Sequence, residues 1–191
     1  MTDRKLARPG YLQEYGATLI DQGYNVVPIM PGKKAPGFDG WQKTSPSKPQ
    51  LKEWLESGHR NSGVGIITKH TPAIDIDVRD DDVAQRMEDW VRANIGDAPL
   101  RVGRWPKRLL MFRTDTPFRK MRSAKWKDQF GDEHQIEILA DGQQFVAYHE
   151  HPDTGQDYQW VDLMGGLEAL RASDLPVVTE KQIAALLAEV S

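Results

Sequence analysis

The stretch Ala73-Ile-Asp-Ile-Asp-Val78 decides how the middle of this chain folds. Its two isoleucines and Val78 alternate with two carboxylates, and successive side chains of a β-strand point to opposite faces of a sheet. The stretch therefore predicts a strand that buries its apolar residues and places Asp75 and Asp77 together on the other face. Carboxylates ~6–7 Å apart along one strand repel each other unless a positive charge lies between them.

A second stretch, His134-Gln-Ile-Glu-Ile-Leu-Ala140, has the same alternation. It predicts a strand with its isoleucines inward and Glu137 on the outer face. Each motif by itself also fits the solvated side of a half-buried sheet. If the two strands are neighbours, however, Asp75, Asp77 and Glu137 form a cluster of three carboxylates. Such a cluster favours a pair of divalent cations that hold a phosphate for in-line displacement.

The segment between these two strands is strongly basic. Residues 101–127 hold ten basic side chains and one acid, Asp115, so the segment carries +9 and leaves −12 on the rest of a chain whose net charge is −3. This asymmetry is typical of a surface that meets phosphates, although a solvated basic face would also produce it. The loop 103–106 brings Lys107 and Arg108 to the head of an apolar strand, where they can offset the charge of a triphosphate.

The composition of the 191-residue chain narrows the class of protein. With 39% hydrophobic and 28% charged residues it is neither a disordered tail nor a membrane protein, and its length suits one domain. No apolar run reaches the ~18 residues of a transmembrane helix, and residues 1–8 precede no apolar segment like that of a secretory signal. The lack of cysteine excludes disulfides, thiolate metal centres and a catalytic thiol, so we expect a cytoplasmic protein.

Periodicity and turn residues predict a mixed α+β domain. Helices are expected at 9–23 (opened by Pro9), 51–58, 81–94 and from Thr179 onward, and strands at 24–29, 64–67, 73–78, 108–113, 134–140, 143–147 and 158–160. The dipeptide Asp141-Gly142 favours a tight turn, which predicts that 134–140 and 143–147 pair as an antiparallel hairpin.

The segment after this turn carries two histidines and two aromatic residues. His149 and His151 would share one face of a strand, yet histidines near a turn are commonly structural, so metal ligation is the weaker interpretation. Tyr158 and Trp160 are expected in the core rather than stacked on a base.

The order and spacing of the motifs, rather than any single one, carry a resemblance to a known family. The segments concerned cover most of the chain and are Gly23-Tyr-Asn-Val-Val-Pro-Ile29, Lys34-Ala-Pro36, Trp41, Asn61-Ser-Gly-Val-Gly-Ile66, Asp75-Ile-Asp77, Arg101-Val-Gly-Arg-Trp-Pro-Lys-Arg108, Ile136-Glu137, Gly142-Gln-Gln-Phe-Val-Ala147, His151-Pro-Asp-Thr-Gly155 and Tyr158-Gln-Trp160. In these the chain resembles the primase–polymerase (prim-pol) domain of the archaeo-eukaryotic primase superfamily, in the form carried by phages and plasmids.

The resemblance implies an α+β fold with an RRM-like catalytic sheet, a smaller N-terminal α/β lobe and a C-terminal helix. Within a single catalytic domain spanning 1–191, residues 1–70 would form mainly the lobe, 71–175 the metal-binding core and 176–191 the helix.

It also implies template-directed, metal-dependent nucleotidyl transfer from a dNTP to a primer 3′-hydroxyl, in phage or plasmid replication. Single-stranded DNA template and primer would be the partners. Asp75, Asp77 and Glu137 would be the catalytic residues and the ligands of two Mg²⁺ or Mn²⁺ ions.

The remaining site residues follow from the same resemblance. Many relatives carry Ser-x-His in the middle motif, whereas this chain has Pro106-Lys-Arg108, as phage-type relatives do. Lys107, helped by Arg108 or Arg101, would therefore contact the triphosphate. Lys34, Asn61 and His151 would also bind the nucleotide. The residues implied for DNA binding are Arg104, Arg113, Arg119, Lys120, Arg122, Lys125 and Lys127.

Relatives are often the front part of a longer chain that continues into a helical module and a helicase. The resemblance thus implies a helicase module or partner, a monomer in the cytoplasm of a bacterial or phage-infected host, and no membrane. We expect extension of a primer, with weak or absent de novo priming.

Two alternatives stay open on the sequence. A replication module could bind nucleotide or DNA without turnover, although an intact set of three acids argues against it. A rolling-circle initiator nuclease needs His-hydrophobic-His and a helix-borne tyrosine nucleophile. In this chain, His149-Glu-His151 has a charged centre and Tyr158 lies in a predicted strand.

Overall fold

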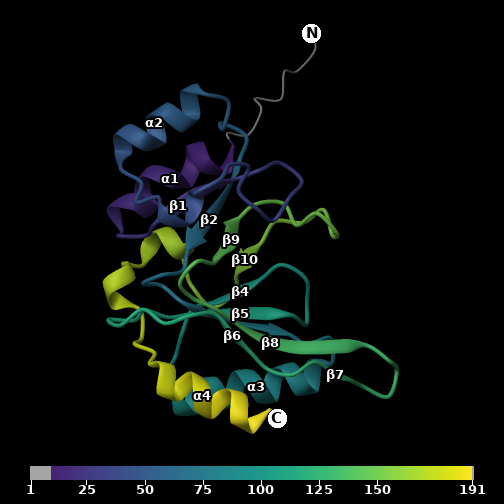
Figure 1. The fold of residues 1–191 in the computed structure, drawn as a ribbon. Coiled ribbons are helices and arrows are strands. Elements are labelled where there is room, and N and C mark those ends of the chain that lie inside the picture. The colour runs from purple at the N-terminus through teal and green to yellow at the C-terminus, as the bar shows by residue number, and fades with distance from the viewer. Residues whose placement is uncertain (1–9, 191) are drawn as a thin grey trace.

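A computed structural model describes residues 10–190 of the chain as two antiparallel sheets with helices at both ends (Figure 1). The smaller sheet has the order β1-β2-β9, with bounds Val26–Ile29, Gly63–Ile67 and Gln144–Tyr148. The larger sheet has the order β10-β4-β5-β3-β8-β6, with β7 paired to β8. Its bounds are β3 Ala73–Asp77, β4 Leu100–Val102, β5 Arg108–Met111, β6 Met121–Arg122, β7 Trp126–Lys127, β8 Glu133–Leu139 and β10 Gln159–Trp160.

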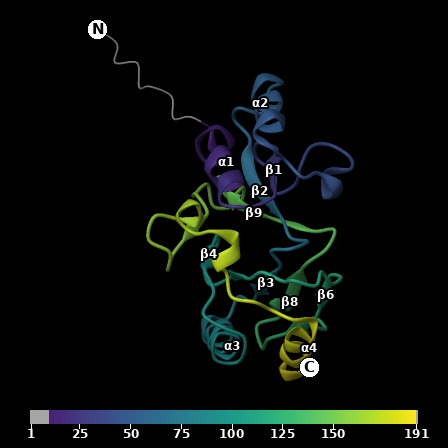
Figure 2. The ribbon, with the colours of Figure 1, turned by 90° about the vertical axis from the view of Figure 1, so that its left-hand side faces the viewer.

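The helices divide between the two sheets. Figures 1 and 2 show α1 and α2 beside the smaller sheet, and α3 and α4 together beneath the larger one. The bounds are α1 Tyr11–Asp21, α2 Lys48–Glu56, α3 Asp81–Asn94 and α4 Glu180–Glu189, with 3₁₀ turns at Trp41–Lys43, Leu167–Ala169 and Ala172–Asp174. The predicted α+β class and the C-terminal helix are confirmed. Pro9, predicted to open the first helix, lies outside the described residues.

Side-chain caps set the starts of the helices that cover the larger sheet. Asp80 precedes α3 and its carboxylate accepts a hydrogen bond from the Val83 backbone N–H at 2.9 Å. Thr179 opens α4 with a capping box in which the Gln182 side chain accepts from the Thr179 N–H. Such caps satisfy N–H groups that the first turn of a helix leaves unpaired.

The inner faces of β3 and β8 are buried as the alternation predicts. Ile74 and Ile76 of β3 pack with Ile136 and Ile138 of β8 in a core that α3 and α4 cover. The other face of the larger sheet turns toward the smaller sheet and is only partly covered. Apolar residues there form a second core with the smaller sheet and with α1.

The predicted hairpin between 134–140 and 143–147 is wrong, because β8 and β9 belong to different sheets. Asp141-Gly142 does form a turn, with Gly142 at φ +82° and the Gln143 N–H bonded to the Ala140 carbonyl at 3.0 Å. One edge of β8 is already taken by β3 and the other by β6 and β7, so the chain leaves the sheet. The connection from β2 to β3 also crosses between the sheets, beside this turn. There the Thr68 hydroxyl donates to the Ala140 carbonyl at 2.6 Å, and the Thr68 N–H donates to the Gln143 carbonyl at 3.0 Å.

The smaller sheet is built from two distant parts of the chain. The smaller sheet combines β1 and β2, from the first 70 residues, with β9 from the segment assigned to the core. The short strands β4, β6 and β7 have no counterpart among the predicted strands.

Within residues 10–190, no helix is long and apolar enough to cross a membrane.

Candidate active site

The three predicted acids lie on one face of the larger sheet. Asp75 of β3 is directly opposite Glu137 of β8 in the antiparallel register, and Asp77 is opposite Gln135. Residues directly opposite each other in such a pair share a face, with Cβ atoms roughly 4.5–5.5 Å apart. The pairing of the two strands, which the sequence left conditional, thus brings Asp75, Asp77 and Glu137 to the same side of the sheet.

The acids begin where the cover of the smaller sheet ends. Ala73, Leu109 and Leu139, on three adjacent strands, are buried in the core between the two sheets. Two residues from each of them comes a charged residue. These are Asp75, after Ala73; Glu137, before Leu139; and Lys107, before Leu109 and just ahead of β5. Asp75 and Glu137 lie opposite each other, whereas Leu109 lies opposite Asp75 and Lys107 comes further out, so the change from apolar to charged residues follows a stepped rim of the inter-sheet core.

Two lysines hold the outer carboxylates. Lys107 forms an ion pair with Asp77, and the Lys120 ammonium lies 3.2 Å from a Glu137 oxygen. Among residues 10–190, no three acidic or histidine side chains converge on a point where they could ligate one ion as they stand. Asp77 and Glu137 each face a lysine instead, so the charge of the cluster is partly balanced from within the chain.

Asp75, between these two pairs, is the least compensated of the acids. Its pKa is raised to about 6, chiefly by burial and also by the charges of Asp77 and Glu137, while Arg101 and Lys107 act in the opposite direction. The cluster is thus short of positive charge at its centre, where an additional cation would be favourable.

Arg101 of β4 forms the wall beside Asp75. Its side chain is 8% exposed, stacks on the ring of Tyr158 with its Cζ 4.5 Å from the ring centre, and donates to the Val146 carbonyl of β9. Its Nε is buried without a hydrogen-bond partner. An unpaired buried donor on a cation is costly, and an anion in the cavity would satisfy it.

The opposite wall is built from the smaller sheet and its loops. The Lys34 ammonium lies 3.6 Å from Asp153, and the Gln144 side chain donates to the Lys34 carbonyl at 2.8 Å. His151 accepts the Asp153 N–H at its Nδ1 at 3.2 Å, and its ring lies 5.1 Å from that of Tyr158. Burial lowers the pKa of His151, and the positive charge of Lys34 lowers it further.

Gly103 lets these walls meet. A Cβ at this position would lie 2.9 Å from the His151 ring and closer still to the ring of Tyr158. No side chain fits there without moving one of the two rings. The residue is therefore a spacing element between β4 and the wall that carries His151.

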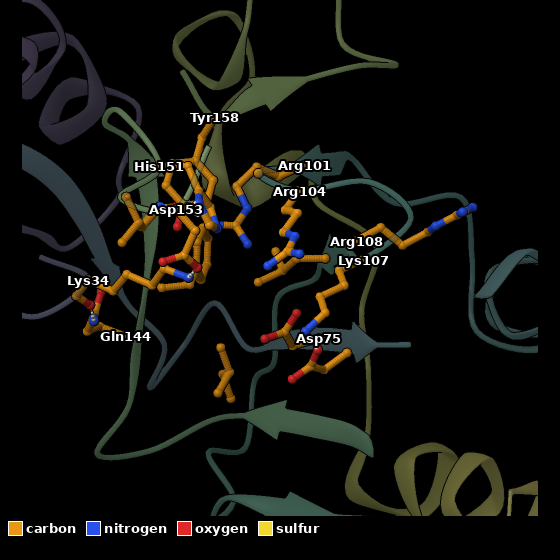
Figure 3. Close-up of a pocket in the computed structure, with 16 residues that line it drawn as sticks. Lys34, Asp75, Arg101, Arg104, Lys107, Arg108, Gln144, His151, Asp153 and Tyr158 are labelled. Carbon is orange, nitrogen blue, oxygen red and sulfur yellow. Dashed lines mark hydrogen bonds and ion pairs between the residues drawn. The ribbon is translucent and has the colours of Figure 1, made fainter. Parts of the chain in front are cut away.

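Together these walls border a cavity of about 290 Å³ that Asp75 and Asp77 line, with Asp75 labelled in Figure 3. The figure shows the side chains of Lys34, Arg101, Arg104 and Lys107 reaching toward this space from different elements. Its other lining residues are Gly103, Arg108, Leu109, Leu139, Gln144, Phe145, Val146, His151, Asp153 and Tyr158.

Arg108, expected to help Lys107 at a triphosphate, points elsewhere. Its partner in the register is Ile76, so its side chain leaves the sheet on the face covered by α3. Its guanidinium binds Asp81, Glu88 and Gln85 of that helix at 2.7–2.8 Å and turns away from the cavity in Figure 3. Alternation along the strand would have separated Lys107 from Arg108, because adjacent residues face opposite ways.

The structure disperses several other predicted residues. Asn61 is exposed in the turn before β2 and does not line the cavity. Arg113 forms an ion pair with Asp115 at 2.8 Å. The backbone of Arg119 forms an isolated parallel β-bridge with that of Asp141, beyond the end of β8. Lys120, Arg122, Lys125 and Lys127 lie along β6 and β7, on the Glu137 side of the sheet, while Arg104 lines the cavity itself.

Sequence reasoning missed three polar residues of the lining. Tyr158 is buried, as expected, yet its ring forms part of the cavity wall under Arg101. Gln144 and Asp153 were passed over because nothing in their local pattern marks them; only the return of β9 to the smaller sheet and the loop after it bring them to Lys34.

Comparison with known proteins places this site in a family. No curated protein matches the chain. The family model described as bifunctional DNA primase/polymerase, N-terminal, matches residues 17–177. This range includes the three carboxylates, the lysines that face them and both walls of the cavity. The chain therefore belongs to the Prim-Pol family, whose function is in general that of a DNA primase/polymerase in replication.

Proposed function

We propose that this domain is a template-directed nucleotidyltransferase that extends a DNA primer in phage or plasmid replication. The primer 3′-hydroxyl attacks the α-phosphate of a dNTP, the bond to the bridging oxygen breaks, and pyrophosphate leaves. The observation that carries this proposal is the pairing of Asp75 with Glu137, which places a third carboxylate beside Asp75 and Asp77, two residues that line a cavity with cationic walls. Catalysis then comes mainly from positioning and from neutralising charge.

The donor set fits Mg²⁺ or Mn²⁺. It consists of carboxylate oxygens, which these cations prefer, and the pKa of its central member, Asp75, is raised by burial in spite of Arg101 and Lys107. We propose that Asp75, Asp77 and Glu137 hold two such ions. When bound, the ions would lower the pKa of the 3′-hydroxyl and offset the charge of the phosphates.

The cationic walls support a role for the chain's own residues at the triphosphate. Arg101 offers an unpaired buried Nε, and Arg104 and Lys34 reach the same space. Lys107 is close enough to Asp77 to hold that carboxylate in place and would transfer its contact to a phosphate when a nucleotide enters. His151, kept neutral by its surroundings, offers a hydrogen bond without adding charge.

The proposal is tested by primer extension on a single-stranded template with dNTPs and either Mg²⁺ or Mn²⁺. Wild type is compared with Asp75→Asn/Asp77→Asn and with Glu189→Gln, which removes one exposed carboxylate from the end of α4. We expect extension by wild type and by Glu189→Gln, and a loss of at least 100-fold, on the order of 3 kcal/mol of transition-state stabilisation, in the double variant. Melting temperatures measured in parallel separate this loss from unfolding.

Failure of wild type to extend a primer with either metal would contradict the proposal. Heat stabilisation by dNTP without turnover would then identify a nucleotide-binding replication module. On an unprimed template we expect weak or absent synthesis by this domain, since we propose that a helicase-linked module contributes to priming. Robust dinucleotide synthesis by this chain would refute that second part.

A further inference from the structure

Phe130 is the most exposed aromatic side chain among residues 10–190. It lies between β7 and β8, at the tip of the turn that joins them, with 81% of its surface open to solvent. The hairpin projects away from the body of the larger sheet in Figure 1. A large aromatic ring in such a position leaves apolar surface in water, where it is free to contact a binding partner.

The turn that carries Phe130 is firmly held. The Asp128 carboxylate accepts the backbone N–H groups of Phe130 and Asp132 at 2.8 and 3.0 Å. The other Asp128 oxygen lies 3.2 Å from the buried His134 Nε2, and Nδ1 of the same ring accepts the Arg79 N–H at 3.1 Å. The exposed ring is thus presented by a defined turn.

The hairpin behind this turn has two unlike faces. Lys127 is opposite Glu133, and Arg122 is opposite Glu137, which in turn is opposite Asp75. Since opposite residues share a face and alternate residues do so along a strand, Arg122 and Lys127 lie on the face that carries the active-site acids. Trp126 and Met121 lie on the other face, packed against the core beneath α3 and α4.

The acid-bearing face carries four cationic side chains between the active site and the turn, interspersed with Glu137 and Glu133. Lys120 contacts Glu137, and Lys125 contacts Glu133 at 2.5 Å. Neither Arg122 nor Lys127 makes an ion pair within the described residues, and both are exposed. Glu137 and Glu133 are four residue steps apart along β8, a span of ~14 Å, or about four stacked nucleotides.

We propose that Phe130 stacks on a base of the single-stranded template, whose phosphates follow Arg122 and Lys127 from the active site to the turn. Cations along a backbone path and an aromatic ring for a base are the two components of single-strand binding without sequence preference. The neighbouring surface favours nucleic acid over an apolar protein partner, because its four cations, Lys120, Arg122, Lys125 and Lys127, outnumber the two acids Glu133 and Glu137 on the same face. This inference rests on the proposed function, since it takes the strand past the site as template.

The test is the fluorescence anisotropy of a labelled 20-nucleotide oligo-dT with the full chain, in EDTA and without dNTP. Wild type is compared with Phe130→Ala, Phe130→Trp and Phe130→Leu. Met164→Ala is the matched control, since Met164 is 96% exposed on a different loop. We expect Phe130→Ala to raise Kd about 5- to 100-fold, as for loss of one stacked base. Phe130→Trp and Met164→Ala should bind as wild type does, and Phe130→Leu should resemble Phe130→Ala.

Salt dependence separates the ring from the cations. Arg122→Gln and Lys127→Gln should each reduce the slope of log Kd against log salt by about 0.7, the value for one phosphate contact on a single strand. Phe130→Ala should weaken binding with the slope unchanged, because stacking releases no counterion.

Three results would overturn the inference: no binding of the oligonucleotide by wild type, wild-type affinity in Phe130→Ala, or full affinity in Phe130→Leu. The last would indicate apolar docking rather than stacking. Primer extension by wild type, combined with wild-type affinity in Phe130→Ala, would refute stacking by Phe130 and leave the proposed nucleotidyl transfer standing. Phe130-dependent binding by a protein that extends no primer would support stacking and refute nucleotidyl transfer alone.

Discussion

Replacing Arg108 by methionine tests whether this residue supports the fold, as its contacts indicate, or the nucleotide. The guanidinium is 1% exposed, and it binds Glu88 and Asp81 at 2.7 Å and the Pro106 carbonyl at 2.9 Å. The ring of Trp105 lies over it at 4.2 Å. Methionine retains much of the length and apolar contact of the side chain but supplies no positive charge and no donor.

The expected loss follows from the partners left behind. Removing one member of a buried ion pair costs about 3–5 kcal/mol, because the other charge stays buried. Here Glu88 keeps a second cation, with Nε of Arg92 at 2.8 Å, and Asp81 is 57% exposed and can turn to water. We therefore expect the lower end, about 3 kcal/mol, which in a chain of this size lowers Tm by roughly 6–12 °C.

The assay is urea and thermal unfolding of wild type, Arg108→Met, Glu88→Gln and the double variant, in a double-mutant cycle. Because Glu88→Gln removes the buried charge that Arg108→Met leaves with Arg92 as its one remaining partner among these contacts, the double variant should recover at least half of the loss. At a temperature where Arg108→Met is folded, dNTP should still raise its Tm as it does that of wild type. Near-wild-type stability together with lost dNTP stabilisation would refute this reasoning and place Arg108 at the nucleotide.

Two further predictions concern the wall opposite the acids. Gly103→Ala forces the Tyr158 or His151 ring to move, so we expect destabilisation of about 1–3 kcal/mol and a smaller dNTP-induced rise in Tm; an unchanged response to dNTP would show that the wall tolerates the methyl group. Burial and the charge of Lys34 lower the pKa of His151, so the folded state favours the neutral ring. The stability that this preference contributes is present above about pH 6.5 and is lost as pH falls through the lowered pKa. Tm measured from pH 8 to pH 5 should therefore fall more in wild type than in His151→Gln, and parallel curves would contradict the shift.

The sequence was enough to predict which side chains share a face of a strand, but not which strands lie next to each other. Alternation in 73–78 and 134–140 was enough to predict that Asp75, Asp77 and Glu137 face away from the helices, because side-chain direction has a period of two. That β3 and β8 are adjacent depends on pairing between residues ~60 apart, for which the local pattern holds no information. The same limit explains the hairpin: Asp141-Gly142 marks a turn, yet the strand that follows pairs with β2.

Arg108 illustrates a different limit. Its charge and its position beside Lys107 suggested a shared role, because two adjacent basic residues look equivalent in the sequence. The acceptors that hold it, Glu88 and Asp81, belong to a helix whose packing on the sheet only the fold specifies. Phe130 stands out for the reverse reason: in the sequence it is an ordinary apolar residue, and only its exposure at the tip of a braced turn distinguishes it.

The stepped rim at which three strands change from apolar to charged residues is also a dielectric boundary. Asp75 has the inter-sheet core on one side and the open cavity on the other, so the effective dielectric constant around it is lower than at a free surface. Charges in such a place are screened little by dissolved ions, whereas contacts at exposed side chains such as Lys127 weaken steeply with ionic strength. Ligands held at the boundary and strands held on the hairpin would therefore respond differently to salt, with the former retained where the latter are released.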